Sequence, residues 1–259
     1  MFIDTHCHIH DDEHAFDIPA VLARAKKAHV SQLIVVGTSS ESSEQAVRFA
    51  QSYTGCFASV GLHPHDAHLG EDTFETIARL APSPKVVAIG EFGLDFYYNN
   101  SPKTDQLQAL EYQLFLAQSL NLPCIFHVRE AFDEFWPVFD RFSGISGVIH
   151  SFTATTRELD KALERGLYLG LNGIMTFTRD QKQLDAAKHV PANRLVLETD
   201  TPFLTPTPKR GTINEPANVE LVAAFLARLR GESLEELSKA TTLNARTLFR
   251  LPVSDHLSV

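Results

Sequence analysis

The segment VVAIG at residues 86–90 has apolar side chains at consecutive positions and is followed directly by an acid, Glu91. LIVV at residues 33–36 has the same continuous apolar character. A strand buried on both faces has such an uninterrupted run, whereas a strand with one solvated face alternates apolar and polar residues. These two segments therefore predict central strands of a sheet that is covered on both sides.

Similar short runs recur along the whole chain, and together they predict eight strands. We place them at Phe2–His6, Gln32–Gly37, Cys56–Leu62, Val86–Gly90, Cys124–His127, Gly147–Ser151, Tyr168–Leu171 and Arg194–Glu198. The longer stretches between them have apolar residues at helical spacing, as in Leu107–Leu120. Because parallel neighbours need a crossover that a helix usually supplies, this alternation predicts a parallel sheet.

The length of 259 residues is close to the ~250 residues of a typical (β/α)8 barrel. We therefore predict an α/β fold with one domain over residues 1–259, a TIM barrel whose site lies at the C-terminal ends of its strands. A doubly wound open sheet is the alternative, and the strand count argues against it. The proline-rich segment Thr201–Asn218 is expected to form a stiff loop after the eighth strand, at the catalytic face.

The charge balance limits the classes of partner. The chain has 23 Lys and Arg against 32 Asp and Glu, a net charge of −9, which argues against a general nucleic-acid or anionic-membrane surface. It leaves room for an acidic substrate that is held by metal ions and a few basic residues. Three cysteines without a CxxC pair, no membrane-length apolar run and no early basic segment favour a cytoplasmic protein, which we expect to be a monomer without membrane contact.

Two histidines on the first predicted strand are the first sign of a metal site. His6 and His8 are two residues apart, so both imidazoles lie on the same face of a strand. A solvated N-terminal pair is the plainer explanation. The pair gains weight because other ligand types follow apolar strands elsewhere in the chain.

Those other ligand types are Glu91 after the fourth strand, His127 and His150 at the ends of the fifth and sixth, and Asp200 after the eighth. Each alone has an ordinary explanation as a hydrogen-bonding residue or a helix cap. Together with His6 and His8 they form a nitrogen and oxygen donor set that suits Zn, Mn or Mg. Six ligands exceed the needs of one tetrahedral ion, so we predict two divalent metal ions with Glu91 as a bridge.

Further candidates lie near these positions. His63, in GLHPH at 61–65, is a candidate catalytic residue that contacts substrate or donates a proton, with a plain loop hydrogen bond as the alternative. Asp95 is expected to position Glu91 or a water molecule. Arg129 and Arg210 are candidates to hold an anionic oxygen, with a solvated surface charge as the alternative for each. The chain has no GxGxxG, Walker-type or GxSxG motif.

These residues together resemble the TatD family of metal-dependent hydrolases, in the wider amidohydrolase superfamily. The matching segments are FIDTHCH at 2–8, GLHPH at 61–65, GEFGLDF at 90–96, HVREA at 127–131, HSF at 150–152, ETDTPFL at 198–204, NEP at 214–216 and NARTLF at 244–249. The resemblance covers nearly the whole chain and implies a (β/α)8 barrel and a divalent-metal nuclease, in a family described as 3′–5′ exonucleases or DNases. It also implies the ligand sets, which are His6, His8, Glu91 and Asp200 for one ion and Glu91, His127 and His150 for the other. The chain departs from the family pattern on the substrate side, at Ala154 and at residues 212–213.

We therefore expect a metal-dependent hydrolase acting on ester bonds, a deoxyribonuclease with 3′–5′ exonuclease activity on single-stranded DNA. A hydroxide that bridges the two ions would attack phosphorus, since coordination lowers the pKa of water toward ~7. Asp200 would orient this hydroxide and accept its proton, while Glu91 holds both ions. Contacts to DNA are expected to be local and weak, through Arg129, Arg210 and His63.

Two other hypotheses use the same residues. A small-molecule amidohydrolase, esterase or lactonase would direct the same hydroxide at a carbonyl carbon, and the net charge of −9 mildly favours it. A metal-bound barrel with only a binding role is the third hypothesis. The presence of all six ligand types argues against that role, because a dead enzyme is free to lose any of them.

Overall fold

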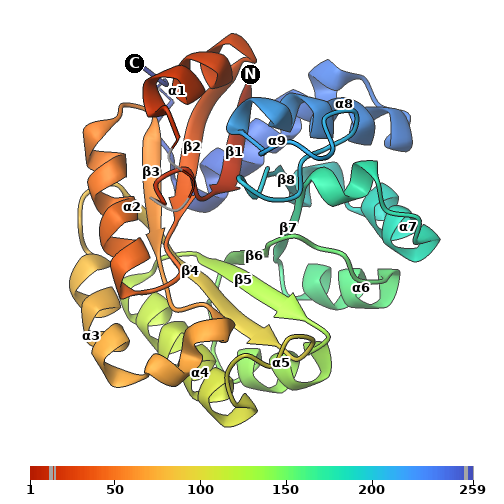
Figure 1. Ribbon diagram of the computed structural model, residues 1–259. Helices are drawn as coiled ribbons and strands as arrows, with labels where there is room; N and C mark the ends of the chain where they lie inside the picture. The colour runs from red at the N-terminus through yellow and green to blue at the C-terminus, as the bar shows by residue number, and fades with distance from the viewer. Residues whose placement is uncertain (12–13, 15, 254–255, 259) are drawn as a thin grey trace.

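The computed structural model describes residues 1–11, 14, 16–253 and 256–258, and in this part of the chain eight parallel strands form one sheet in the order β1 to β8. The strands are β1 (Phe2–Cys7), β2 (Val30–Val36), β3 (Cys56–Val60), β4 (Val86–Asp95), β5 (Cys124–Arg129), β6 (Gly147–Ile149), β7 (Tyr168–Leu171) and β8 (Leu195–Leu197). The α-helices are α1 (Ile18–Lys27), α2 (Ser40–Ser52), α3 (Glu71–Leu80), α4 (Lys103–Leu120), α5 (Phe132–Phe139), α6 (Thr156–Glu164), α7 (Gln181–His189), α8 (Val219–Arg230) and α9 (Leu234–Phe249). Short 3-10 helices are η2 (Pro64–Leu69), η3 (Gly173–Thr176), η4 (Ala192–Arg194) and η5 (Pro216–Asn218). Figure 1 shows the helices surrounding the strands.

Hydrogen bonds between the first and last strands close the sheet into a ring. Cys7 and Thr201 form a parallel bridge just beyond β8. The Asp200 N–H donates to the His6 carbonyl at 2.9 Å, and the His8 N–H donates to the Thr201 carbonyl at 2.7 Å. The predicted barrel is therefore confirmed, and the open-sheet alternative is wrong.

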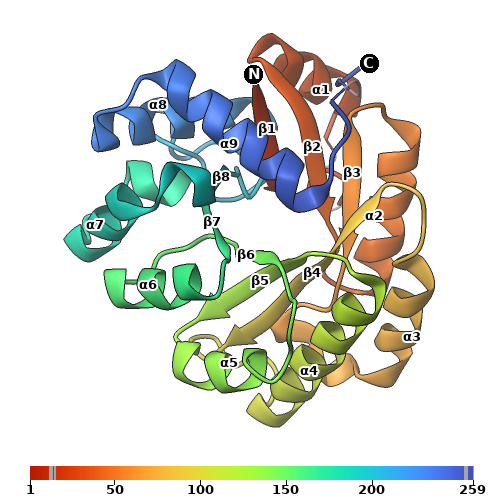
Figure 2. The ribbon, with the colours of Figure 1, turned by 180° about the vertical axis from the view of Figure 1, so that it is seen from behind.

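Two apolar layers hold the barrel together. Successive residues of β2 alternate between them, since Leu33 packs outward among the helices and Ile34 packs inside the ring. The inner layer also includes Leu248 and Phe249 of α9. Seen from behind in Figure 2, α9 runs across this end of the barrel. One end is thus closed by apolar side chains, and the polar residues collect at the other.

β4 is longer than its apolar run predicts. The prediction ended this strand at Gly90, but the structure continues it to Asp95, so Glu91 lies within the strand. The two glycines of GEFGLD suggest a break, yet Gly93 pairs with His127 of β5. A Cβ atom at Gly93 would collide with the His127 carbonyl, so only glycine allows this close approach.

The segment after β8 forms a loop, as predicted, until η5 begins at Pro216. Its own hydrogen bonds hold it in shape. The Asn214 side-chain amide donates to the carbonyls of Thr199 at 2.9 Å and Phe203 at 2.6 Å, and the Thr205 hydroxyl donates to the Thr212 carbonyl at 2.6 Å. These contacts support the expectation of a stiff loop.

Among the described residues, no helix combines the length and the apolar character that crossing a membrane requires. The expectations of a cytoplasmic location and a monomeric state stay predictions.

A buried carboxyl group, that of Asp4, joins β1 to the segment after β8. Asp4 Oδ1 accepts from the Thr199 N–H at 2.9 Å, and Asp4 Oδ2 lies 2.6 Å from the Thr199 hydroxyl, which donates to it. Burial raises the pKa of Asp4 to about 8, against the lowering effect of its hydrogen bonds to Thr199. The hydrogen bonds of this carboxyl group to Thr199 hold the closure.

We predict that Asp4→Ala lowers the free energy of unfolding by about 1–3 kcal/mol, because it leaves the buried Thr199 N–H without an acceptor. Asp4→Asn is the matched control. Its amide oxygen can still accept from Thr199, so the loss should be less than half as large. Urea unfolding followed by circular dichroism at pH 7 measures both, and equal losses for the two variants would contradict this role of Asp4.

Candidate metal centre

Side chains from five strands converge at the carboxyl end of the barrel. His6 lies on β1 with His8 just beyond it, Glu91 is on β4, His127 is on β5, His150 follows β6 and Asp200 follows β8. Together with His63, their ligand atoms form three groups that could each hold a metal ion, namely His6 with His8 and Asp200, His6 with Glu91 and His150, and His63 with Glu91 and His127. The structure thus brings all six predicted ligands together.

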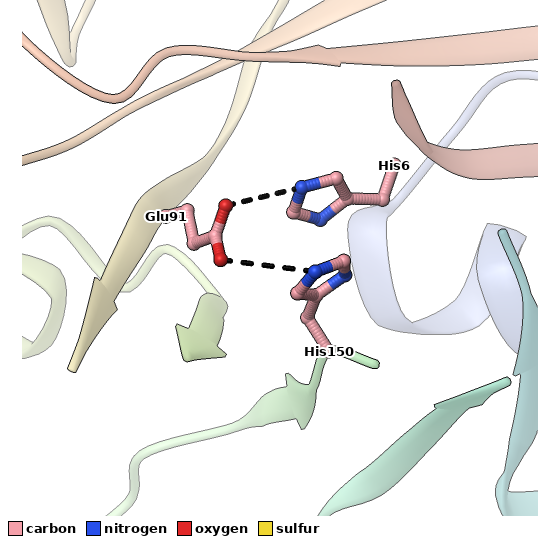
Figure 3. Close-up of side chains that lie close together, drawn as sticks. All are labelled: His6, Glu91 and His150. Atoms are coloured by element: carbon pink, nitrogen blue, oxygen red, sulfur yellow. Dashed lines mark ion pairs between the residues drawn. The ribbon is translucent and has the colours of Figure 1, made fainter. Parts of the chain in front are cut away.

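The Glu91 carboxylate lies at the middle of this centre. Its Oε2 is 3.2 Å from His6 Nε2, and its Oε1 is 2.8 Å from His127 Nδ1 and 3.7 Å from His150 Nε2. In Figure 3 one Glu91 oxygen points toward His6 and the other toward His150. Because the two oxygens of one carboxylate face different histidines, Glu91 has the geometry of a bridging ligand.

In three of the histidines, one ring nitrogen contacts another protein group and the other faces the centre. His8 Nδ1 donates to the Val36 carbonyl at 2.9 Å, which leaves Nε2 facing Asp200 Oδ1 at 3.5 Å. His127 Nε2 lies 3.1 Å from Asp95 Oδ2, which leaves Nδ1 facing Glu91. Such outer contacts select the tautomer whose free nitrogen can bind a metal ion. Asp95 therefore contacts His127 rather than Glu91, and its expected role in positioning a water molecule stays a prediction.

The third outer partner, Glu198, was not predicted. Its Oε1 accepts from the Ser151 N–H at 2.7 Å and lies 3.1 Å from His150 Nδ1, an ion-pair distance without a well-aligned hydrogen bond. A Cβ atom at Gly170 would collide with this carboxylate, so the glycine of β7 makes the space for it. The signal was available, since Glu198, like Asp200, follows the buried strand β8.

The charges of the centre call for a cation. Among the described residues, every ion-pair partner of Glu91 and Asp200 is a histidine, and no Lys or Arg joins them. Burial opposes ionisation of Glu91, but His150, His6 and His63 outweigh it and hold its pKa well below the ordinary value. Burial also lowers the pKa of His150, yet Glu198, Glu91 and Asp200 raise it to about 10. A metal ion that binds His150 must therefore displace its proton.

The residues fit divalent metal ions. Glu91 Oε1 and His127 Nδ1 are 2.8 Å apart, and with Asp95 on the other ring nitrogen a proton or a cation must lie between them. His6 Nε2 and His8 Nε2 face each other at 3.1 Å. Imidazole and carboxylate donors without thiolate suit Zn, Mn or Mg. The side chains of Asp200 and His127 are 15% and 18% exposed, so a substrate can reach the centre.

His63 lies beside the six ligands, and its tautomer sets what it can do. Its Nδ1 accepts from the His65 N–H at 3.2 Å, and its Nε2 lies 3.6 Å from Glu91 Oε1. Burial, joined by the nearby His127, holds the pKa of His63 well below its usual value, so the ring is neutral. A neutral ring whose Nδ1 accepts carries its proton on Nε2. His63 is thus better suited to donate a hydrogen bond than to bind a metal ion.

The two predicted arginines both stack on aromatic rings. The Arg129 guanidinium lies 4.2 Å from the ring centre of Tyr97 and 4.6 Å from that of Tyr98. The Arg210 guanidinium lies 3.8 Å from the Phe177 ring centre and donates to the Thr205 carbonyl at 2.9 Å. Arg210 therefore has a structural role in the loop, whatever else it binds, and the contact of either arginine with a substrate stays a prediction.

A parallel eight-stranded barrel with imidazole and carboxylate ligands at the carboxyl ends of its strands defines a metal-dependent hydrolase. The chain matches the model of the TatD related DNase family over residues 3–250. It belongs to this family of metal-dependent hydrolases, which act on ester bonds.

The chain is also similar to individual members of this family over nearly its whole length. The chain is 36% identical over 254 residues to the uncharacterised metal-dependent hydrolase YabD of Bacillus subtilis strain 168, covering 97% of this chain and 100% of the relative. It is 42% identical over 245 residues to the 3′-5′ ssDNA/RNA exonuclease TatD of Enterobacter lignolyticus strain SCF1, covering 91% and 94%. The crystal structure of YJJV, a TatD homolog from Escherichia coli K12, is similar with a TM-score of 0.91 at 32% identity, over 97% of this chain and 98% of that one.

We predict that Glu91→Gln loses at least one metal ion, because an amide of the same shape cannot neutralise two cations. Glu71→Gln, at an exposed acid in the first turn of α3, is the control and should keep the metal content of the wild type. Elemental analysis after reconstitution and gel filtration counts the ions, and circular dichroism checks the fold. Full metal content in Glu91→Gln would show that Glu91 is not the bridge.

Proposed function

We propose that the protein hydrolyses the phosphodiester bonds of single-stranded DNA from the 3′ end, with two divalent ions held by the six ligands. The observation that carries the proposal is the placement of the two Glu91 oxygens, which face separate donor groups. The relative named 3′-5′ ssDNA/RNA exonuclease supports the choice of substrate and polarity. When bound, the ions would activate water and neutralise charge on the phosphoryl oxygens.

The protein groups around the ions have separate roles in this proposal. Asp200, 15% exposed and 3.5 Å from His8 Nε2, is placed to orient the attacking water and to accept its proton. The Nε2–H of His63 is placed to donate a hydrogen bond to a phosphate oxygen. Asp95 and Glu198 keep His127 and His150 in the tautomers that bind metal.

The metal-free protein should stay folded and lose its activity. Two apolar layers form the core without help from the ions, unlike a zinc finger that folds only with its metal. Activity on 5′-labelled single-stranded DNA should return when Mg, Mn or Zn is added to the chelated protein. Unchanged activity after chelation, with metal verified as absent, would exclude metal-dependent hydrolysis.

Single-stranded DNA with a free end should be degraded, and a closed circle of the same sequence should resist. The Thr201–Asn218 loop is braced by its own hydrogen bonds, so it favours a chain end at the metal centre over a long strand lying across it. A time course on the linear and circular strands, with mononucleotide release as the readout, tests this. Rapid cutting of the circle would contradict digestion from an end.

The same assay includes RNA and a panel of esters, lactones and amides as comparison substrates. Turnover of a lactone or an amide without hydrolysis of either nucleic acid would overturn the nuclease proposal and favour a small-molecule hydrolase.

A further inference from the structure

Two neighbouring tyrosines beside the metal centre are unusually exposed for their size. Tyr97 is 53% exposed and Tyr98 is 54% exposed, and both lie in the turn after β4. Their rings are perpendicular, with centres 4.8 Å apart, and the Arg129 guanidinium lies against both. We name Tyr97, Tyr98 and Arg129 the tyrosine platform. Large aromatic side chains normally contribute their area to a core or an interface, so their exposure here needs a reason.

The protein holds this platform in place. Asp95 Oδ1 accepts from the backbone N–H groups of both Tyr97 and Tyr98 at 2.9 Å. The other oxygen of Asp95 contacts His127, so one carboxylate positions a metal ligand and the turn that carries the tyrosines. Arg129 is on β5, in register with Asp95 on β4, and these two strands lie side by side in Figure 1. The platform therefore has a fixed position relative to the metal centre.

The platform is also close to that centre. The Tyr98 ring lies 5.4 Å from the His65 ring, and the His65 ring lies 4.4 Å from that of His63. Arg129 is two residues beyond His127 on the same strand. None of the ion pairs among the described residues engages Arg129, so its N–H donors are available to an anion.

We propose that the tyrosine platform binds the nucleotide next to the bond that is cut, with its base stacked on a tyrosine ring and its phosphate on Arg129. This inference rests on the proposed function and adds the way in which the substrate is held. Exposed aromatic rings beside a guanidinium are a recurring means of binding single strands without reading their sequence, because every base has a flat face. A base within a duplex is already stacked on its neighbours, so the platform favours unpaired ends.

A protein partner is the competing explanation for an exposed aromatic pair. The position argues for a substrate, because Asp95 ties the pair to the metal ligand His127. An aromatic surface remote from the centre also exists and provides a control. Phe115 on α4 is 59% exposed and lines a groove with Phe74 and Phe142.

The test compares two single-stranded oligodeoxynucleotides that differ only at the 3′ end. One ends in two thymidines, and the other carries tetrahydrofuran abasic residues there. With the metal-loaded wild type, kcat/KM should be roughly 10-fold or more higher for the oligomer that keeps its bases. Tyr97→Ala with Tyr98→Ala should bring this ratio near one, whereas the paired Phe variants and Phe115→Ala should keep it. Arg129→Ala should lower kcat/KM for both oligomers and leave the ratio unchanged.

A binding measurement separates this inference from the proposed function. A phosphorothioate oligomer with 2-aminopurine near its 3′ end should lose fluorescence when it binds the wild type, because stacking quenches the base. The quench should vanish in the Tyr→Ala pair and persist in the Tyr→Phe pair. If the wild type quenches the 2-aminopurine fluorescence but cuts neither oligomer, base binding by the tyrosine platform is supported and the proposed nuclease activity is overturned. If the Tyr97→Ala, Tyr98→Ala variant is folded by circular dichroism and keeps both the kcat/KM ratio and the fluorescence quench of the wild type, the platform inference is wrong.

Discussion

The joining of the first and last strands is the constraint on which the site depends. When Asp200 N–H bonds to the His6 carbonyl and His8 N–H bonds to the Thr201 carbonyl, the ends of the barrel sheet become neighbours. The two histidines of β1 then meet the acid that follows β8, although almost the whole chain separates them in sequence. The buried carboxyl group of Asp4 reinforces this closure through its hydrogen bonds to Thr199. A ring that failed to close would separate His6 and His8 from Asp200.

A second layer of contacts determines which ring nitrogen each histidine presents to the metal centre. A histidine can present either nitrogen, and the choice is made by what binds the other one. The Val36 carbonyl and Asp95 make that choice for His8 and His127, and Glu198 lies at ion-pair distance from His150 Nδ1. His63 differs, because its Nδ1 accepts a backbone N–H and its Nε2 keeps a proton. Rings of the same type therefore have different chemistry a few ångströms apart.

The electrostatics explain how an acidic protein could act on an acidic substrate. With a net charge of −9, the surface as a whole does not attract nucleic acid. Positive charge would instead come from ions at the metal centre and from single arginines supported by aromatic rings. Asp95 links these two elements, since it contacts His127 with one oxygen and orients the Tyr97–Tyr98 turn with the other. In the proposed function, recognition is concentrated where the bond is cut.

Local sequence determined the strands, the loop after β8 and the identity of the candidate ligands. Apolar runs and the polar residues at their ends report burial directly, so Glu91, His127, His150 and Asp200 could be placed at one end of a barrel from their strands alone. Tertiary structure decided what those runs do not encode. β4 continues through its glycines because β5 approaches closely at Gly93, and Asp95 turns to His127 rather than to Glu91. Glu198 reaches His150 only because β6, β7 and β8 are neighbours and Gly170 leaves room. The direction of a side chain and the partner of its second polar atom depend on which strands lie side by side, and that is a property of the closed ring.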